Sequence, residues 1–236
     1  LDVAGLVEVS ATALGHPLLD AKHRIPIDVT IGPPGTLEYV TGSNMAGKST
    51  LLRAIGLNVV LAQAGSAVCA SSMRCPPVAL YTSMRVQDSL ERGVSYFMAE
   101  LERLKLIVDA AHAAHAAQDS GRRTLLYLLD EILHGTNSVE RAIAARHVLA
   151  RLARLGAIGA VTSHDLQLAD TQELAGVANH VHFRENFLRA PDGTPTMHFD
   201  YRLRPGKAES SNALKLLELV GLGIGLSGTD SRASVD

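Results

Sequence analysis

The sequence predicts an α/β fold in which helices flank a mostly parallel central sheet. Two observations support this prediction. Short apolar runs that end in polar residues alternate along the chain with longer segments whose apolar residues recur at helical spacing. The length of 236 residues and the hydrophobic content of 47% suit one domain with one large core. In folds of this class, the chemistry lies outside the carboxyl ends of the strands.

The first strand and the first helix are predicted on either side of a glycine-rich segment. Residues 36–42 (TLEYVTG) are a short β-type run that ends at a glycine. The segment that follows predicts a helix from about Lys48 to Gly65. Its apolar residues at helical spacing are Leu51, Leu52, Ile55, Val59 and Ala62. Residues 66–93 are rich in turn formers and contain CPP, so we expect irregular structure or a small β insertion there.

The second half of the chain continues the alternation. A long helix is expected over residues 95–120. Residues 124–131 (TLLYLLDE) have the unbroken apolar run that is typical of a strand buried on both faces of a parallel sheet. Residues 138–156 predict another helix that stops at a glycine, and residues 157–165 (AIGAVTSHD) predict another buried strand with a polar carboxyl end.

The glycine-rich segment TGSNMAGKST has the spacing of a phosphate-binding loop. Gly42 and Gly47 enclose four residues, and a Lys-Ser pair follows, in the strand, loop and helix context that the motif requires. In that motif, backbone N–H groups and the positive end of the helix surround the β-phosphate. Lys48 is expected to neutralise β- and γ-phosphate oxygens, and Ser49 to offer its hydroxyl to Mg²⁺. The predicted nucleotide-binding residues of the segment are Gly42, Ser43, Asn44, Met45, Ala46, Gly47, Lys48, Ser49 and Thr50.

Two strand ends carry the groups that hydrolysis needs. Asp130 can hold Mg²⁺ directly or through water, and Glu131 beside it can orient or deprotonate the attacking water. His164, at the matching end of the next strand, could sense the γ-phosphate or position the water. A solvated acidic pair and a structural histidine are the alternative interpretations. We therefore predict ATP and Mg²⁺ as cofactors, Ser49 and Asp130 as metal contacts, and Glu131 and His164 as catalytic residues.

Composition excludes several classes of function. The net charge of -2 and the absence of Trp leave no basic stripe of the kind that neutralises nucleic-acid phosphates. No apolar run reaches the roughly 18 residues of a membrane span, and the N-terminus lacks a signal-peptide pattern, so we expect a cytoplasmic protein without membrane contact. Cys69 and Cys75 are expected to be free thiols. Because the chain does not begin with Met, we expect an excised domain over residues 1–225, with a disordered or truncated tail at residues 226–236.

The glycine-rich segment also resembles the nucleotide loop of the MutS family of DNA mismatch-repair ATPases. Asn44 and Met45 distinguish this loop from a generic phosphate loop. Further matches occur in the family's order, and they are GHPLL, LAQAGSAVCA, GVSYFMAELERLKLIVDAA, LLDEILHGTNSVERAIAA, TSHDLQLAD and FDYRLRPGKAESSNALKLLELVGL. Together they cover nearly the whole chain up to about Gly225. The resemblance is to the C-terminal ATPase domain, without the mismatch-recognition, lever and clamp domains.

This resemblance implies a fold of the ABC-ATPase type, a P-loop NTPase that works as a face-to-face homodimer with composite ATP sites. In such dimers the segment DSLERGVSYFMAE would be the signature region, and Ser95 would meet the γ-phosphate held by the other subunit. A helix cap is the alternative interpretation of Ser95. Residues 134–138 (HGTNS) resemble the family's loop that crosses the dimer interface. DNA would be bound mainly by domains absent from this chain.

The base-binding segment and one loop residue depart from the family's pattern. The family commonly has an aromatic residue and, three residues later, an Asn that contact adenine, where this chain has Arg24 and Ile27. Arg24 could stack on the base by its guanidinium plane, and Ile25 is predicted as a nucleotide contact in the same segment. Tyr201 aligns with a family position near the base, and an ordinary strand tyrosine is the alternative. His134 stands where better-known relatives have Arg, which indicates a divergent branch.

The functional prediction is an ATP-binding and ATP-hydrolysing domain of a MutS-like DNA repair protein, which drives conformational change on DNA as a nucleotide-dependent dimer. The open alternative is an interaction module that binds ATP, dimerises and signals with negligible turnover. The presence of both Glu131 and His164 favours the enzyme. A small-molecule kinase is disfavoured because NMAGKST, DEILHGT and TSHD occur together and no acceptor-binding lid is evident.

Overall fold

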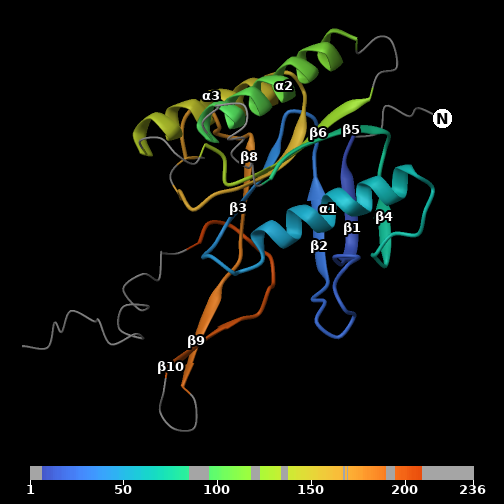
Figure 1. Ribbon diagram of the computed structural model, residues 1–236, viewed down its shortest axis with the longest axis vertical. Coiled ribbons are helices and arrows are strands. Elements are labelled where there is room, and N and C mark those ends of the chain that lie inside the picture. Colours follow the sequence, from blue (N-terminus) through green and yellow to red (C-terminus); the bar gives the residue numbers. More distant parts are fainter. Residues whose placement is uncertain are drawn as a thin grey trace, which may run out of the picture.

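A six-stranded sheet forms the centre of the computed structural model, which describes residues 7–84, 96–117, 123–133, 138–166, 168, 170–189 and 195–208 (Figure 1). The strand order is β11-β8-β3-β7-β6-β5. Neighbours from β8 to β5 run parallel, whereas β11 pairs antiparallel with β8. The strands are β3 (Leu37–Thr41), β5 (Val78–Ser83), β6 (Thr124–Asp130), β7 (Ile158–Thr162), β8 (Ala178–His182) and β11 (Arg204–Pro205). This sheet confirms the α/β fold with a mostly parallel sheet that the sequence predicts.

Two smaller antiparallel sheets accompany the central one. In the first, β1 (Val9–Leu14) lies between β2 (Ile27–Ile31) and β4 (Ser72–Arg74). In the second, β9 (Glu185–Arg189) pairs with β10 (Pro195–Phe199). Figure 1 shows that this second pair extends away from the central sheet. The connection between β1 and β2 and the residues that follow β10 border the cleft described below.

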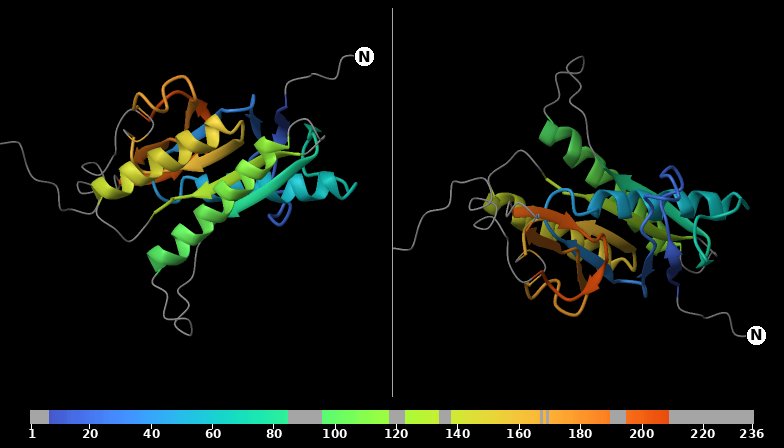
Figure 2. Two further views of the ribbon diagram at one scale, coloured as in Figure 1. Left: turned by 90° about the horizontal axis from the view of Figure 1, so that it is seen from above. Right: turned by 90° about the horizontal axis from the view of Figure 1, so that it is seen from below.

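Helices cover both faces of the central sheet. α2 (Tyr96–Ala116) and α3 (Ser138–Arg154) contact each other and share one apolar cluster with the sheet, whereas α1 (Lys48–Gln63) packs in another (Figure 1 and Figure 2). Buried residues of β1 and β2 join the cluster of α1. The domain therefore has two apolar layers, one on each face of the sheet. Among the helices of the described residues, none combines the length and the apolar character that crossing a membrane requires.

The side chains of β6 alternate between these two layers. Leu126 and Leu128 belong to the cluster that contains α1, whereas Leu125, Tyr127 and Leu129 belong to the cluster that contains α2 and α3. Such alternation is the period of two that a strand imposes on its side chains. All five residues are buried, which confirms the prediction of a strand covered on both faces. The carboxyl end of β6 is thereby fixed at Asp130.

Most predicted elements agree with the structure, and one differs. The helix predicted from Lys48 begins there, and the three predicted strands are β3, β6 and β7. For residues 66–93 the sequence predicts irregular structure or a small β insertion. The strand β4, in a small sheet, agrees with the second alternative, but β5 belongs to the central sheet beside β6. Sequence alone concealed β5 because two prolines, Pro76 and Pro77, directly precede it and indicate a loop. The predicted tail, residues 226–236, lies outside the described residues.

Candidate functional site

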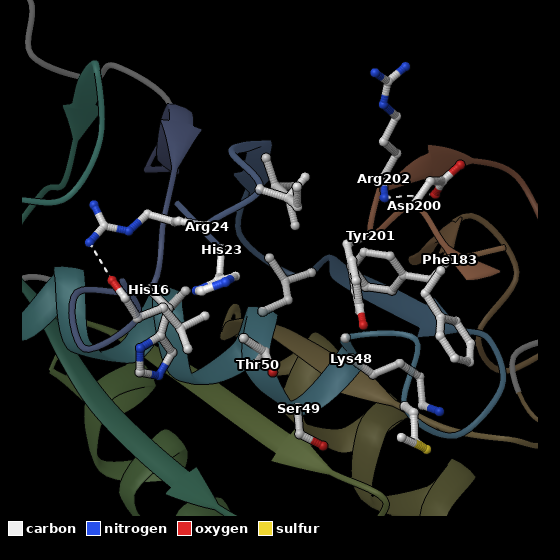
Figure 3. Close-up of a pocket in the computed structure, with 18 of the residues that line it drawn as sticks. His16, His23, Arg24, Lys48, Ser49, Thr50, Phe183, Asp200, Tyr201 and Arg202 are labelled. Carbon is white, nitrogen blue, oxygen red and sulfur yellow. Dashed lines mark hydrogen bonds between the residues drawn. The ribbon is translucent and has the colours of Figure 1, made fainter. Parts of the chain in front are cut away.

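A cleft of about 1150 Å³ lies beyond the carboxyl end of β3 (Figure 3). It is bounded by the glycine-rich segment that leads into α1, by the connection between β1 and β2, and by the residues that follow β10. Three stretches that are far apart in the sequence therefore meet where the parallel strands end. This is the edge at which α/β folds place their sites.

Two glycines of the segment between β3 and α1 adopt backbone conformations that other residues rarely adopt. Gly42 has a φ of 139° and Gly47 has a φ of 106°. A Cβ at Gly42 would lie 2.9 Å from the carbonyl oxygen of Phe183, and one at Gly47 would lie 3.2 Å from Cδ1 of Tyr201. Both positions therefore require glycine. The first residues of α1 line the cleft, and the first N–H groups of a helix have no intrahelical partner, so this end suits an anion.

Lys48 lies at the inner end of the cleft and is only 4% exposed. Its Nζ donates to the backbone oxygens of Gly42 at 2.8 Å and Ser43 at 3.0 Å. The same nitrogen lies 3.7 Å from Oε1 of Glu131 and 3.4 Å from Nδ1 of His164. Burial lowers the pKa of the Lys48 ammonium below its usual value, although Glu131 acts in the opposite direction. A buried cation thus stands beside the loop and beside both predicted catalytic side chains.

Asp130 accepts hydrogen bonds from two hydroxyl groups. Ser49 donates its hydroxyl to Oδ1 of Asp130 at 3.0 Å, and Thr162 donates to the same oxygen at 2.7 Å. The register of β6 and β7 pairs Asp130 with Thr162, which explains why these side chains meet. The Thr162 hydroxyl also accepts from the backbone N–H of Glu131 at 3.0 Å. The Thr162 hydroxyl therefore links the Asp130 carboxylate to the backbone of Glu131.

Sequence reasoning missed this role of Thr162. The available signal was its place as the last residue of a buried apolar run, directly before SHD. That signal identifies a polar strand end, but the partner of the hydroxyl depends on which strand lies next to β7.

Glu131 and His164 contact each other directly. His164 Nε2 contacts Oε1 of Glu131, so the two predicted catalytic residues are brought together. Glu131 has a φ of 51°, a left-handed conformation that is uncommon for a residue with a side chain. Its backbone N–H also donates to the Thr162 carbonyl oxygen at 3.2 Å, which adds to the hydroxyl contact. The surrounding structure thus imposes a conformation that aims the Glu131 side chain toward Lys48 and His164.

The outer end of the cleft is formed by exposed side chains on loops. Ile25 is 42% exposed and Tyr201 is 40% exposed, and both line the cleft. Tyr201 lies between β10 and β11 and not in a strand, with a φ of 53°. The Arg24 guanidinium donates to the backbone oxygen of Leu19 at 2.7 Å, and Figure 3 shows it directed away from Lys48. The stacking role considered for Arg24 therefore has no support in this conformation.

His23 also lines the cleft and was not among the residues that the sequence singled out. Figure 3 shows its ring near the middle of the cleft. No motif surrounds His23, and its neighbour Arg24 drew attention only because it aligns with an aromatic position of the family. A histidine in a turn between two strands carries no signal of its own.

The remaining predicted residues divide into three groups. Those that line the cleft are Ser43, Asn44, Met45, Gly47, Lys48, Ser49 and Thr50. Ala46 is buried beneath the segment, and Ser43 donates its hydroxyl to Oε2 of Glu185 at 3.1 Å. Ser95 and His134 lie outside the described residues, so the predicted dimer contact and the predicted divergent branch stay predictions.

Comparisons with known proteins agree on one family. The family described as MutS domain V matches residues 38–225 of the chain. The endonuclease MutS2 of Thermomicrobium roseum is 33% identical over 219 residues, which are 92% of this chain and 25% of that protein. The DNA mismatch repair protein MutS of Natronomonas pharaonis is 31% identical over 211 residues, which are 88% of this chain and 23% of that protein.

A plant relative extends the range of the comparison. The DNA mismatch repair protein MSH6 of Arabidopsis thaliana is 30% identical over 227 residues, which are 92% of this chain and 16% of that protein. The chain therefore spans about a quarter or less of the length of these three relatives.

Proposed function

The chain belongs to the MutS domain V family, and from this premise we propose that it is the ATP-binding and ATP-hydrolysing domain of a MutS-like DNA repair protein. The proposal includes a P-loop NTPase fold of the ABC type. One observation carries it: two segments far apart in the sequence meet at the inner end of one cleft, where Lys48 lies beside Glu131 and Ser49 contacts Asp130. A cation and two carboxylates at the start of a helix are the groups that phosphoryl transfer requires.

Lys48 and the glycine-rich segment would bind the phosphates. The backbone oxygens of Gly42 and Ser43 hold the Lys48 ammonium within the loop, at the place where the segment turns into α1. A triphosphate at this end of the cleft would meet the ammonium and the N–H groups of the first turn together. Charge-assisted hydrogen bonds to phosphate are stronger than those to neutral carbonyl oxygens, so Lys48 would exchange its present partners for the ligand.

Ser49 and Asp130 fit a magnesium ion. Their oxygens lie 3.0 Å apart. Two adjacent ligands of an octahedron with Mg–oxygen distances of about 2.1 Å have about this separation. Both donors are oxygens, which Mg²⁺ prefers, and two protein ligands leave positions for water and phosphate. When bound there, Mg²⁺ would neutralise charge on the β- and γ-phosphate oxygens.

Glu131 would act on the attacking water, with His164 beside it. The contact between the two side chains keeps the Glu131 carboxylate at the inner end of the cleft, next to the Lys48 ammonium. A carboxylate there can orient a water molecule or take its proton, whereas the imidazole can hold the carboxylate or the water. At the outer end, Ile25 and Tyr201 would contact the base, because both are exposed toward the cleft.

The test of this function separates binding from chemistry. Glu131→Gln keeps the shape of the side chain and removes the charge, so MgATP affinity should stay within a few-fold while turnover falls by about a hundredfold or more. Affinity is measured by titration with a fluorescent ATP analogue, and turnover by single-turnover release of phosphate.

Two outcomes would count against the enzyme. Turnover at the wild-type level in Glu131→Gln would remove the catalytic role from Glu131. Tight MgATP binding with negligible turnover in the wild-type chain would favour the alternative, an ATP-dependent interaction module.

We further propose that the domain works as a homodimer in which Ser95 of one subunit meets the γ-phosphate bound by the other. The support is the resemblance of the signature region and the two-fold symmetry of such dimers, which would make two composite sites from one surface. DNA contact in the parent protein would come mainly from domains outside this chain, since the net charge of -2 provides no basic footprint.

Sedimentation velocity tests the dimer. The Glu131→Gln chain should associate when MgATP is added, because a site that cannot hydrolyse retains the nucleotide. Ser95→Arg in that background should abolish association while monomer nucleotide affinity stays unchanged, since the added bulk and charge act only where the second subunit arrives. A chain that remains monomeric with MgATP, or a Ser95→Arg variant that still associates, would contradict the composite site.

A further inference from the structure

Tyr39 of β3 carries a buried hydroxyl that reaches a distant loop. The side chain is 0% exposed and belongs to the apolar cluster on the face of α2 and α3. Its hydroxyl donates to the backbone oxygen of Asp165 at 2.7 Å, across 126 positions of sequence. Asp165 directly follows His164. A hydrogen bond from the core of the sheet therefore ends one residue away from the side chain that contacts Glu131.

Two further hydrogen bonds hold the same loop. The N–H of Ser163 donates to the backbone oxygen of Val40 at 3.1 Å, and the N–H of Asp165 donates to the Ser163 hydroxyl at 3.0 Å. The residues on both sides of His164 are thus tied to β3 or to each other. The His164 side chain itself is 41% exposed, and its ring reaches Glu131 and Lys48. The position of the ring depends on the loop backbone more than on packing around the ring.

The burial of Tyr39 makes its hydrogen bond consequential. Burial raises the pKa of the Tyr39 phenol, so the hydroxyl remains a donor at neutral pH. If residues 163–165 moved, the Tyr39 hydroxyl would lose the Asp165 carbonyl oxygen as its acceptor. A buried hydroxyl without a hydrogen bond in an apolar cluster lowers stability. The hydrogen bond therefore stabilises the present conformation of residues 163–165 relative to conformations that lack it.

A second tyrosine provides the contrast. Tyr127 lies in the same apolar cluster and is also 0% exposed, on β6. Within the described part of the chain its hydroxyl has no hydrogen-bond partner. Both tyrosines are fully buried, but only the hydroxyl of Tyr39 donates a hydrogen bond to the loop that carries His164.

We propose that Tyr39 is a positioning residue, whose hydroxyl holds residues 163–165 so that the His164 imidazole stays against Glu131. This inference rests on the proposed roles of Glu131 and His164 in hydrolysis. Tyr39 touches no nucleotide in this arrangement, because it lies in the core behind the loop and does not line the cleft.

Tyr39→Phe tests the proposal with the smallest possible change. It removes the hydroxyl and keeps the ring, including its edge-on contact with the ring of His180. Single-turnover hydrolysis should fall about tenfold, the scale of one lost hydrogen bond, while MgATP affinity stays unchanged. Tyr127→Phe is the matched control and should leave hydrolysis unchanged. Equal hydrolysis in wild type and Tyr39→Phe, or equal loss in both tyrosine variants, would overturn the proposal.

A double-mutant cycle shows whether Tyr39 acts through His164. In a His164→Ala background, Tyr39→Phe should cause no further loss, since the side chain that it positions is gone. A full additional tenfold loss in that background would overturn the proposal.

A second readout does not depend on hydrolysis. The imidazole resonances of His164 in NMR spectra, identified by their absence in His164→Ala, should shift or broaden in Tyr39→Phe and stay unchanged in Tyr127→Phe. Unchanged His164 resonances in Tyr39→Phe would overturn the positioning role. If instead the wild-type chain hydrolyses no ATP and the resonances do respond, the proposed function fails while the positioning of His164 stands.

Discussion

The two ends of the cleft are built in different ways. At the inner end, Lys48 is 4% exposed and Thr162 is 0% exposed, and hydrogen bonds join them to strands and to the loop. At the outer end, Ile25 and Tyr201 are about two-fifths exposed on connections outside the strands. The difference teaches that, if the proposed function holds, the sheet would fix the groups that act on the phosphates, whereas surface side chains would contact the base.

The two ends differ because strands restrain side chains more tightly than surface loops do. The register of β6 and β7 sets Asp130 beside Thr162, so this pair at the inner end can separate only if the pairing of these strands changes. Loops vary more easily in conformation and in sequence, because few buried contacts restrain them. Substitutions should therefore have large effects at the inner end and small effects at the outer end.

The largest effect is expected at Lys48. Lys48→Ala removes the side-chain cation next to the phosphates, so MgATP binding should weaken by at least about a hundredfold, to the point of being undetectable. Titration with a fluorescent ATP analogue measures the affinity, and circular dichroism establishes that the variant is folded. Unchanged affinity in a folded variant would contradict the assignment of the inner end to phosphates.

An intermediate effect is expected at Thr162. Thr162→Val keeps the shape of the side chain but removes the hydroxyl that Asp130 and the Glu131 N–H share. Turnover should fall roughly tenfold to a hundredfold, since a bond to a charged group and a second bond are lost together. Thr162→Ser, which retains the hydroxyl, is the matched control and should stay within a few-fold of wild type in the same phosphate-release assay. If the Val and Ser variants are equally active, the hydroxyl does not organise the site.

The sequence predicted the inner end better than the outer end. Lys48 and Ser49 follow from a motif of fixed spacing, and Asp130 follows from an apolar run that must end at the edge of a buried strand. Each of these signals is local, and the local structure agrees with it. The outer end has no local signal, so Arg24 was considered for stacking although its guanidinium binds Leu19, and His23 was missed.

Side-chain contacts between strands could not be predicted from the sequence for a different reason. The Thr162 hydroxyl meets Asp130 only because β7 lies beside β6, and the Tyr39 hydroxyl meets Asp165 only because β7 also lies beside β3. Strand order is a property of the whole sheet. Strand β5 illustrates the same limit, because its place beside β6 depends on a pairing with a distant strand, whereas the two prolines before it indicate a loop.

The smallest effect is expected at Tyr201, and it sharpens the comparison most. The exposed ring lies at the outer end of the cleft, with the Phe199 ring centroid 6.0 Å away, where it can cover one face of a base. Tyr201→Ala should weaken MgATP affinity by only about threefold to tenfold, the scale of one aromatic contact. Tyr201→Phe keeps the ring and should bind as wild type does. Magnesium tripolyphosphate, which has no base, should bind all three proteins equally when it competes with a fluorescent ATP analogue. A loss of tripolyphosphate affinity in Tyr201→Ala would mean that Tyr201 supports the loop at Gly47, which its ring approaches, and that the two ends are not independent.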